Sequence, residues 1–174
     1  MTYKLGDTFV TFDPSLTSTG YAVATDHTQS GLKACGQITT QSGYPLASRL
    51  DELMLHVQQV LTEAKPVQAV IETPALKTHG RIPGRAQGQA LYGCAVGVVF
   101  AVCSSRLGFA AVECVDPSWT GRESEKARVT RIRREFSRVD WPKSHNGTKD
   151  QATAVALGQW WYQRRRMAFM AGVI

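Results

Sequence analysis

The sequence contains few of the residues that stabilise small proteins covalently or through zinc. Its 174 residues include only four cysteines and four histidines. No two cysteines form a Cys-x-x-Cys pair, and all four lie in apolar stretches. We therefore expect reduced core cysteines in a cytoplasmic protein that is not secreted, and neither a disulfide framework nor a zinc site.

Long hydrophobic runs, repeats and low-complexity tracts are also missing. The longest apolar run, residues 93–103, is too short to cross a bilayer, and no signal peptide opens the chain. We therefore expect no membrane partner. The length and the 43% hydrophobic content predict a single domain over residues 1–174, with a frayed tail from about 167.

Acidic residues are scarce in the second half of the chain. Residues 1–75 hold 4 Lys/Arg and 7 Asp/Glu, a balance of −3, whereas residues 76–174 hold 16 and 7, a balance of +9. This asymmetry predicts a polyanionic partner that binds mainly to the second half. Charge alone is weak support, because many proteins without such a partner are basic.

The pattern of apolar residues predicts alternating strands and helices. Three antiparallel strands come first, and a helix then leads to a strand that returns parallel to the first. A helix, a strand and two helices follow. The expected strands are 10–13, 21–25, 32–40, 67–71 and 109–115. The first expected helix opens at Pro45 and stops before Pro66, and the others are 86–106, 123–136 and 148–166, the last with Thr148 as its N-cap.

Three carboxylates stand at the ends of these elements. Asp13 ends the first strand, Glu72 ends the fourth, and Asp150 lies in the first turn of the final helix. Each also has a simpler interpretation: Asp before Pro stabilises turns, and an acid in a first turn complements the helix dipole. Three acids at one sheet edge would repel one another unless divalent cations neutralised them, and oxygen ligands suit Mg²⁺. With the basic second half, this chemistry predicts a metal-dependent nuclease.

Three segments resemble the signature segments of RuvC-type Holliday junction resolvases, which belong to the RNase H-like superfamily. They are Phe12-Asp13-Pro14-Ser15 followed by Thr19-Gly20-Tyr21, then Val70-Ile71-Glu72, and finally Asp150-Gln151-Ala152-Thr153. The resemblance runs through about residues 10–166. It implies an α/β fold with a central five-stranded mixed sheet, three antiparallel strands then two parallel, flanked by helices.

The resemblance also implies an activity. The family cuts four-way DNA junctions as a homodimer by paired nicks, using Mg²⁺, for which Mn²⁺ often substitutes. By resemblance, Asp13, Glu72 and Asp150 are catalytic metal ligands, the partner is four-way or branched DNA, and the host is a bacterial or phage-infected cell.

The chain departs from the family pattern at the fourth metal ligand. The family usually has Asp or His three residues before the final Asp, where this chain has Gly147. His145 and Asn146 precede it, and we nominate His145 as the displaced fourth ligand.

The predicted DNA contacts lie in the second half. Relatives tend to carry an aromatic residue just after the fourth-strand Glu, but here Leu76 or basic residues would have to substitute. The polar segment 73–85 predicts a loop beside the carboxylates, although a plain solvated connection is about as common. Lys126 matches a family basic residue that holds a phosphate near the scissile bond. The expected DNA-binding residues are Lys77, Arg81, Arg85 and Lys126.

A stripe of small residues, Gly93, Gly97 and Ala101, runs along the helix expected at 86–106. Such a stripe lets another backbone approach closely, which here means either the protein's own sheet or a second subunit.

Two other functions remain open. Hairpins with an Asp and a Gly seven residues later also begin actin-like ATPases and sugar kinases, which share the RNase H-like core but need a further domain. A catalytically inactive junction-binding relative is the third interpretation, against which the intact Asp13, Glu72 and Asp150 argue.

Overall fold

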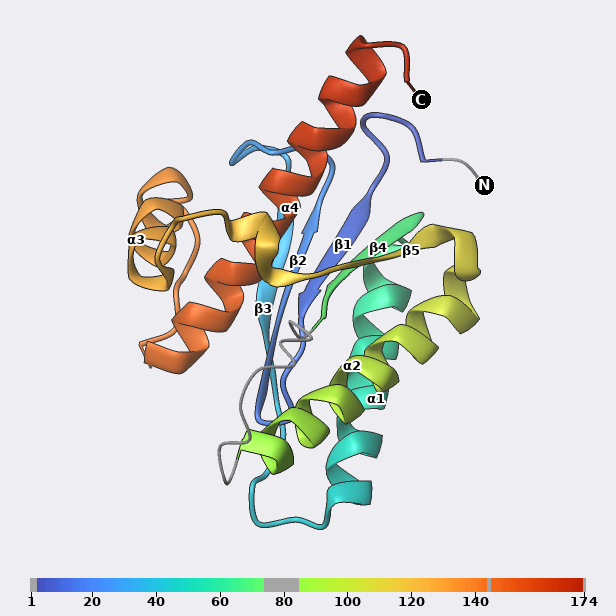
Figure 1. The fold of residues 1–174 in the computed structure, drawn as a ribbon, viewed down its shortest axis with the longest axis vertical. Coiled ribbons are helices and arrows are strands. Elements are labelled where there is room, and N and C mark those ends of the chain that lie inside the picture. The colour runs from blue at the N-terminus through green and yellow to red at the C-terminus, as the bar shows by residue number, and fades with distance from the viewer. Residues whose placement is uncertain (1–2, 74–84, 144, 174) are drawn as a thin grey trace.

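One mixed sheet forms the centre of the protein (Figure 1). The computed structural model describes residues 3–73, 85–143 and 145–173, and the side chains of 85–87 and 145–147 lie outside that description. The strand order is β3-β2-β1-β4-β5, with β1–β2 and β2–β3 antiparallel and β1–β4 and β4–β5 parallel, which confirms the expected sheet. The strands are β1 (Phe9–Asp13), β2 (Ser18–Ala24), β3 (Leu32–Thr39), β4 (Gln68–Glu72) and β5 (Val112–Val115).

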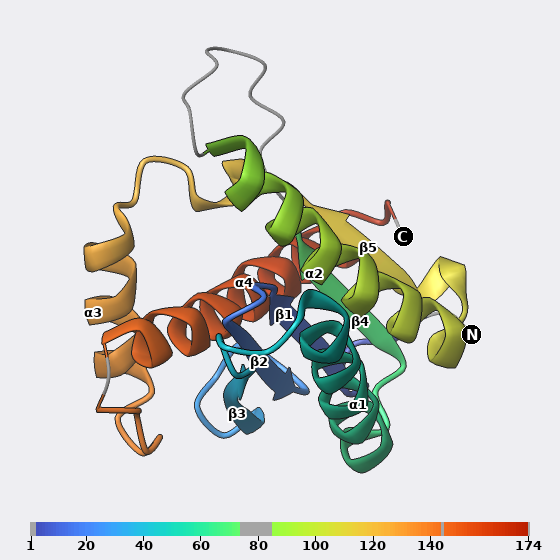
Figure 2. The same ribbon diagram turned by 90° about the horizontal axis from the view of Figure 1, so that it is seen from below.

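Helices cover both faces of the sheet. On one side α1 and α2 pack against each other, and on the other side α4 crosses the sheet with α3 beside it (Figures 1 and 2). The described helices are α1 (Leu46–Ala64), α2 (Arg85–Leu107), α3 (Glu125–Glu135) and α4 (His145–Met170), with short 3₁₀ turns η1 (Phe109–Ala111) and η2 (Pro117–Thr120).

Successive side chains of β1 point to opposite faces of the sheet, so they belong to different parts of the hydrophobic core. Val10 and Phe12 are fully buried in the cluster that includes α1 and α2. Phe9 belongs to the cluster around Trp161 of α4 on the other face. Thr11 is also fully buried, and its hydroxyl donates to a carbonyl of α4. The odd-numbered positions of β1 therefore face α4.

Contacts with β1 and β2 fix the direction in which α4 crosses the sheet. The Thr11 hydroxyl donates to the carbonyl oxygen of Ala154 at 2.6 Å. One turn later, a Cβ on Gly158 would lie 3.3 Å from the Phe9 ring, so the helix passes close to the sheet there. The start of α4 therefore lies over the carboxyl end of β1, where Asp13 stands.

Four element boundaries differ from those expected by three residues or more. β2 begins at Ser18 rather than Tyr21, because Ser18 and the next two residues pair with β3. β5 begins at Val112, because Gly108, with φ of 87°, ends α2 and the chain then makes one 3₁₀ turn.

The final helix is longer at both ends than expected. It begins at His145, so Thr148 lies inside the helix and its hydroxyl donates to the carbonyl oxygen of Pro142 at 2.5 Å. Gly147 also lies inside the helix, where glycine costs about 1 kcal/mol relative to Ala. The helix also continues through Met170, past the expected end at Arg166.

Helix α2 presents its small residues outward. Ala95, Val99 and Cys103 are fully buried, whereas a Cβ on Gly93 or Gly97 would meet nothing within 4 Å. The stripe therefore does not pack on the protein's own sheet. Contrary to the estimate from residues 93–103 alone, Gly88–Leu107 is long and apolar enough by composition to span a membrane, with mean hydropathy 1.6 and 22% of it buried. Its buried side belongs to the core of this domain.

Candidate active site

Asp13 and Glu72 end two neighbouring parallel strands at the same edge of the sheet. The register of β1 and β4 pairs Phe12 with Ile71, so the next residue on each strand is the acid. Asp13 has the same parity as Thr11 and therefore belongs to the face that α4 covers. Both carboxylates are partly buried.

A glycine brings the third acid to this edge. Gly20 pairs with Asp13 across β1 and β2. A Cβ on Gly20 would lie 2.0 Å from the backbone oxygen of Asp150 and 2.9 Å from the nitrogen of Gln151. The first turns of α4 therefore rest directly on Gly20. Only a residue without a side chain permits this approach, which explains the glycine of the hairpin motif.

Burial raises the pKa of all three acids, and repulsion by the other two raises that of Asp13 further. Burial contributes most to a pKa of Asp13 well above its usual range, and the negative charges of Glu72 and Asp150 add to it. Burial also raises the pKa of Glu72 and of Asp150. The site therefore holds carboxyl groups that ionise less readily than free ones, and a bound cation would offset this effect.

Two cationic side chains partly offset this charge. Lys149 lies next to Asp150 and also forms an ion pair with Glu125 of α3, with 3.3 Å between Nζ and Oε2. Lys149 and Arg128 both act to lower the pKa of Asp13 and of Glu72.

Two hydrogen bonds orient the acids. The indole Nε1 of Trp119 donates to Oε2 of Glu72 at 3.1 Å. Ser18 hydrogen-bonds Asp150 and so lowers the pKa of that carboxyl against the larger effect of burial. Each bond favours the ionised form of its carboxyl group.

The donor set suits a hard divalent cation such as Mg²⁺, because it consists of carboxylate oxygens from three elements. Within the described part of the chain, no three His, Cys, Asp or Glu side chains already stand close enough to share an ion. Asp13, Glu72 and Asp150 affect one another electrostatically across wider gaps. Binding would therefore draw them together.

The nominated fourth ligand and three of the predicted DNA contacts cannot be located by side chain. The side chains of His145 and Arg85 lie outside the described residues, as do Lys77, Arg81 and Leu76 altogether. His145 forms the first residue of α4, five positions before Asp150.

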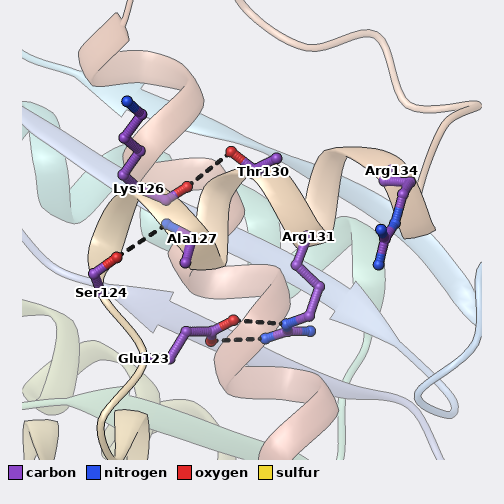
Figure 3. A pocket seen from close by; sticks show the side chains of 7 residues that line it. All are labelled: Glu123, Ser124, Lys126, Ala127, Thr130, Arg131 and Arg134. Atoms are coloured by element: carbon purple, nitrogen blue, oxygen red, sulfur yellow. Dashed lines mark hydrogen bonds and ion pairs between the residues drawn. The ribbon is translucent and has the colours of Figure 1, made fainter.

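Lys126 lies on the outer side of α3. It is exposed and lines a shallow pocket of about 520 Å³ together with Ser124, Thr130 and Arg134 (Figure 3). Among the described residues, the cations that act on the three acids are Arg128 and Lys149, and Lys126 is not one of them. The structure therefore brings Asp13, Glu72 and Asp150 together and leaves Lys126 on a separate surface.

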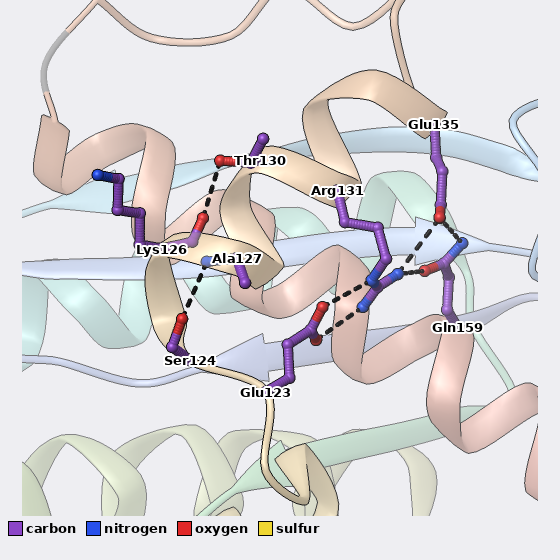
Figure 4. Close-up of polar contacts among 8 residues, drawn as sticks. All are labelled: Glu123, Ser124, Lys126, Ala127, Thr130, Arg131, Glu135 and Gln159. Carbon is purple, nitrogen blue, oxygen red and sulfur yellow. Dashed lines mark hydrogen bonds and ion pairs between the residues drawn. The ribbon is translucent and has the colours of Figure 1, made fainter.

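An ion-pair network fixes α3 against α4 (Figure 4). Arg131 donates to both carboxylate oxygens of Glu123, at 2.9 and 3.0 Å. Its Nη1 also donates to Gln159 of α4 at 3.0 Å and to Glu135 at 3.3 Å. These bonds hold the pKa of Glu123 below its usual range. The two-pronged contact fixes the orientation of α3, which carries Arg128.

Five described side chains near the acids escaped the sequence analysis: Ser18, Trp119, Arg128, Lys149 and Tyr92. Burial, with the charges of Asp13 and Glu72, raises the pKa of Tyr92 well above its usual value, so this phenol of α2 also lies near the acids. For Lys149 the adjacency to Asp150 was a visible signal. Nothing in the sequence distinguished Arg128 from the other arginines of α3.

The comparisons with known proteins agree with this geometry. Residues 9–78 match the family model described as crossover junction endodeoxyribonuclease RuvC. No curated protein matches the chain in sequence.

Three solved structures share the fold. Thermus thermophilus RuvC in complex with a Holliday junction substrate has a TM-score of 0.71 at 16% identity, and the match covers 92% of this chain and 96% of that one. A further Thermus thermophilus RuvC structure has a TM-score of 0.65 at 18% identity, with the same coverage. The yeast mitochondrial Holliday junction resolvase Ydc2 has a TM-score of 0.61 at 11% identity, covering 99% of this chain and 85% of that one. The chain thus has the fold of the RuvC structures that it matches, and its first part resembles the RuvC family in sequence, as its motifs predicted.

Proposed function

We propose that this protein is a metal-dependent endonuclease that resolves four-way DNA junctions. The observation that carries the proposal is the convergence of Asp13, Glu72 and Asp150 at one sheet edge, where the charges of Glu72 and Asp150 add to the raised pKa of Asp13. The matching RuvC family model and the similarity to a RuvC bound to a Holliday junction support the choice of substrate. A DNA substrate also favours the cytoplasm of a bacterial or phage-infected cell.

In this proposal the three carboxylates hold Mg²⁺, or Mn²⁺ in its place, with His145 as a candidate fourth ligand. Bound metal would supply an activated water and would stabilise the leaving oxygen in phosphodiester hydrolysis. The chain's own contribution is positional. Ser18 and Trp119 hold Asp150 and Glu72 in orientation. Lys149 and Arg128 limit the repulsion before metal binds.

The junction arms would lie on the basic second half. We propose that Lys126 and Arg134, which line the outer pocket of α3, contact the DNA backbone together with Lys77, Arg81 and Arg85. Log affinity should fall linearly with log salt concentration, and each lost phosphate contact should lower the slope by about 1. Lys126→Ala and Arg134→Ala test this.

Arg165 supplies a matched control for those substitutions, because its guanidinium donates to Glu113 at 2.9 Å at the far end of α4. Arg165→Ala should leave the salt slope of junction binding unchanged. An equal effect from Arg165 and Lys126 would mean that α3 is no DNA surface.

Paired cuts on opposite strands of a four-way junction need two active sites related by a two-fold axis. We propose that α2 supplies the contact between two subunits. Gly93 and Gly97 leave open space on its outer side, and Ala101 is exposed there too, so a second backbone could approach closely. In the described structure these small residues do not pack on the protein's own sheet, which was the alternative interpretation.

The decisive experiment compares a four-way junction with plain duplex DNA in the presence of Mg²⁺. We expect paired nicks on the junction, little cleavage of the duplex, and cleavage at background level for Asp13→Asn with junction binding retained. ATP hydrolysis is measured on the same preparation. Hydrolysis of ATP without DNA cleavage would favour the actin-like alternative, and junction binding without cleavage would favour the inactive relative. Normal cleavage by Asp13→Asn would contradict the metal site.

A further inference from the structure

Trp119 is the one described side chain outside the acids that donates a hydrogen bond to Glu72. It lies in η2, directly after β5, and its Nε1–H reaches Oε2 of Glu72 at 3.1 Å. An indole N–H can only donate, so the bond persists only while this oxygen accepts. The contact leaves the other carboxylate oxygen, Oε1, without a described partner. It therefore selects which oxygen is available to a cation.

The guanidinium of Arg128 stacks on the face of the Trp119 ring. The guanidinium carbon lies 5.3 Å from the ring centroid, within the range of a cation–π contact. Only 8% of Arg128 is exposed, and its Nε has no hydrogen-bond partner in the described structure. A buried guanidinium normally pairs with a carboxylate, because an unpaired buried charge is costly. Stacking on Trp119 near the acids is the interaction that the structure offers in its place.

The surroundings make this pair rigid. Glu123, three residues after η2, is held by Arg131 of α3 through two parallel hydrogen bonds (Figure 4). Arg128 lies on the same helix, so the segment of Trp119 and the helix of Arg128 are tied together. The Trp160 ring of α4 packs against Trp119, with 6.1 Å between centroids.

We propose that Trp119, held by the stacked Arg128, is a positioning residue that orients the Glu72 carboxylate for metal binding. This inference rests on the proposed function, because it assigns a role within that metal site. A tryptophan that served only to fill the core would need its ring but not its N–H. The two roles therefore separate in a variant that keeps a ring and loses the donor.

The test is Mn²⁺ binding by the full chain without DNA, measured by calorimetry and by the Mn²⁺-induced rise in melting temperature. Trp119→Phe keeps an aromatic ring against Arg128 and removes the donor. We expect Mn²⁺ affinity to fall about 10- to 100-fold, the usual effect of losing a group that orients a metal ligand. Trp160→Phe is the matched control, because Trp160 stacks in the same cluster without a described bond to an acid, and its affinity should stay at the wild-type value.

Arg128→Lys tests the second half of the pair. Lysine keeps the charge near the acids and loses the planar group that stacks on the ring. We expect a severalfold loss of Mn²⁺ affinity. Wild-type affinity in this variant would show that the charge alone matters and would overturn the role assigned to stacking.

A third measurement requires no substitution. In ¹⁵N-labelled protein, the indole resonance of Trp119 should shift when Mg²⁺ is added, and that of Trp160 should shift much less. An unmoved Trp119 resonance, or wild-type Mn²⁺ affinity in Trp119→Phe, would overturn the positioning role while leaving the nuclease proposal intact. Absence of Mn²⁺ binding by the unaltered protein would overturn both.

Discussion

The two long helices α2 and α4 pack on opposite faces of the same sheet, and they differ in how much of their own surface is buried. Residues 151–158 of α4 are all buried against β1 and β2 or against α3. Helix α2 buries Ala95, Val99, Val102 and Cys103 but exposes Gly93 and Gly97. The middle of α4 is thus buried on every side, whereas α2 leaves one side exposed.

The difference follows from what each helix carries. Helix α4 carries Asp150, whose position is set by backbone contact with Gly20, and a small displacement would move a candidate metal ligand. Helix α2 brings Tyr92 near the acids but leaves an apolar side in solvent, which a second subunit would cover. One helix is thus fitted to the site, and the other is available for assembly.

The same substitution at two glycines tests this contrast most strongly. Alanine at Gly20 would place a Cβ 2.0 Å from the Asp150 carbonyl oxygen, whereas alanine at Gly97 would meet nothing within 4 Å. We expect Gly20→Ala to lose cleavage and to cost about 1–3 kcal/mol or more of unfolding free energy. Gly97→Ala should gain about 0.5–1 kcal/mol in the monomer from helix propensity. Urea unfolding measures both, and equal effects would contradict the close approach of α4.

A larger side chain on α2 tests assembly. Gly97→Leu should leave the fold intact by circular dichroism, because the position is open in the monomer. It should weaken self-association about 5- to 150-fold, the equivalent of 1–3 kcal/mol of overpacking, and leave nicks unpaired. Sedimentation checks the first effect and junction cleavage the second.

Ser48→Leu on the exposed side of α1 controls for an added apolar side chain. It should change neither assembly nor cleavage. A strict monomer that still makes paired cuts would end the symmetric-dimer proposal, and a Gly97→Leu dimer as tight as wild type would place the contact elsewhere.

The acids beneath α4 should make the metal-free protein sensitive to pH. Asp13 has a raised pKa in the folded state, so the folded protein binds more protons than the unfolded chain once the pH exceeds about 4. Stability should therefore fall as pH rises from about 4 through the raised pKa. Asp13→Asn should melt higher than wild type at pH 7 and show a shallower decline. Mg²⁺ should stabilise the wild type and have little effect on the variant.

A single hydrogen bond gives the smallest expected effect. Thr11→Val removes the bond to the Ala154 carbonyl that helps hold α4, and should cost about 1 kcal/mol. Thr62→Val removes a similar bond to Gln58 on the exposed side of α1 and should stay within about 0.5 kcal/mol of wild type. If Thr62→Val lowered the unfolding free energy as much as Thr11→Val, the buried hydrogen bond would contribute no more than an exposed one.

Sequence patterns predicted most of the fold because the apolar residues follow the periods of strand and helix closely. The helix between Pro45 and Pro66 and the strand ending in Glu72 were expected almost as found, since prolines bound them. The start of β5 was wrong because Phe109 and Ala110 are as apolar as strand residues, although Phe109 is 75% exposed. The start of α4 was wrong because Thr148 resembles an N-cap, whereas the helix already begins at His145.

The sequence by itself determined which acids stand at the ends of which elements, because strand and helix ends leave local signals in the order of residues. Only the tertiary structure decided which basic and aromatic side chains join Asp13, Glu72 and Asp150. Arg128 is distinguished from Lys126 by the face of α3 that packs inward, and Trp119 meets Glu72 across 47 residues. The same holds for the small residues of α2. Their spacing placed them on one side of the helix, but only the structure shows that this side faces away from the sheet. Contacts between distant elements arise from packing, and packing is a property of the whole chain.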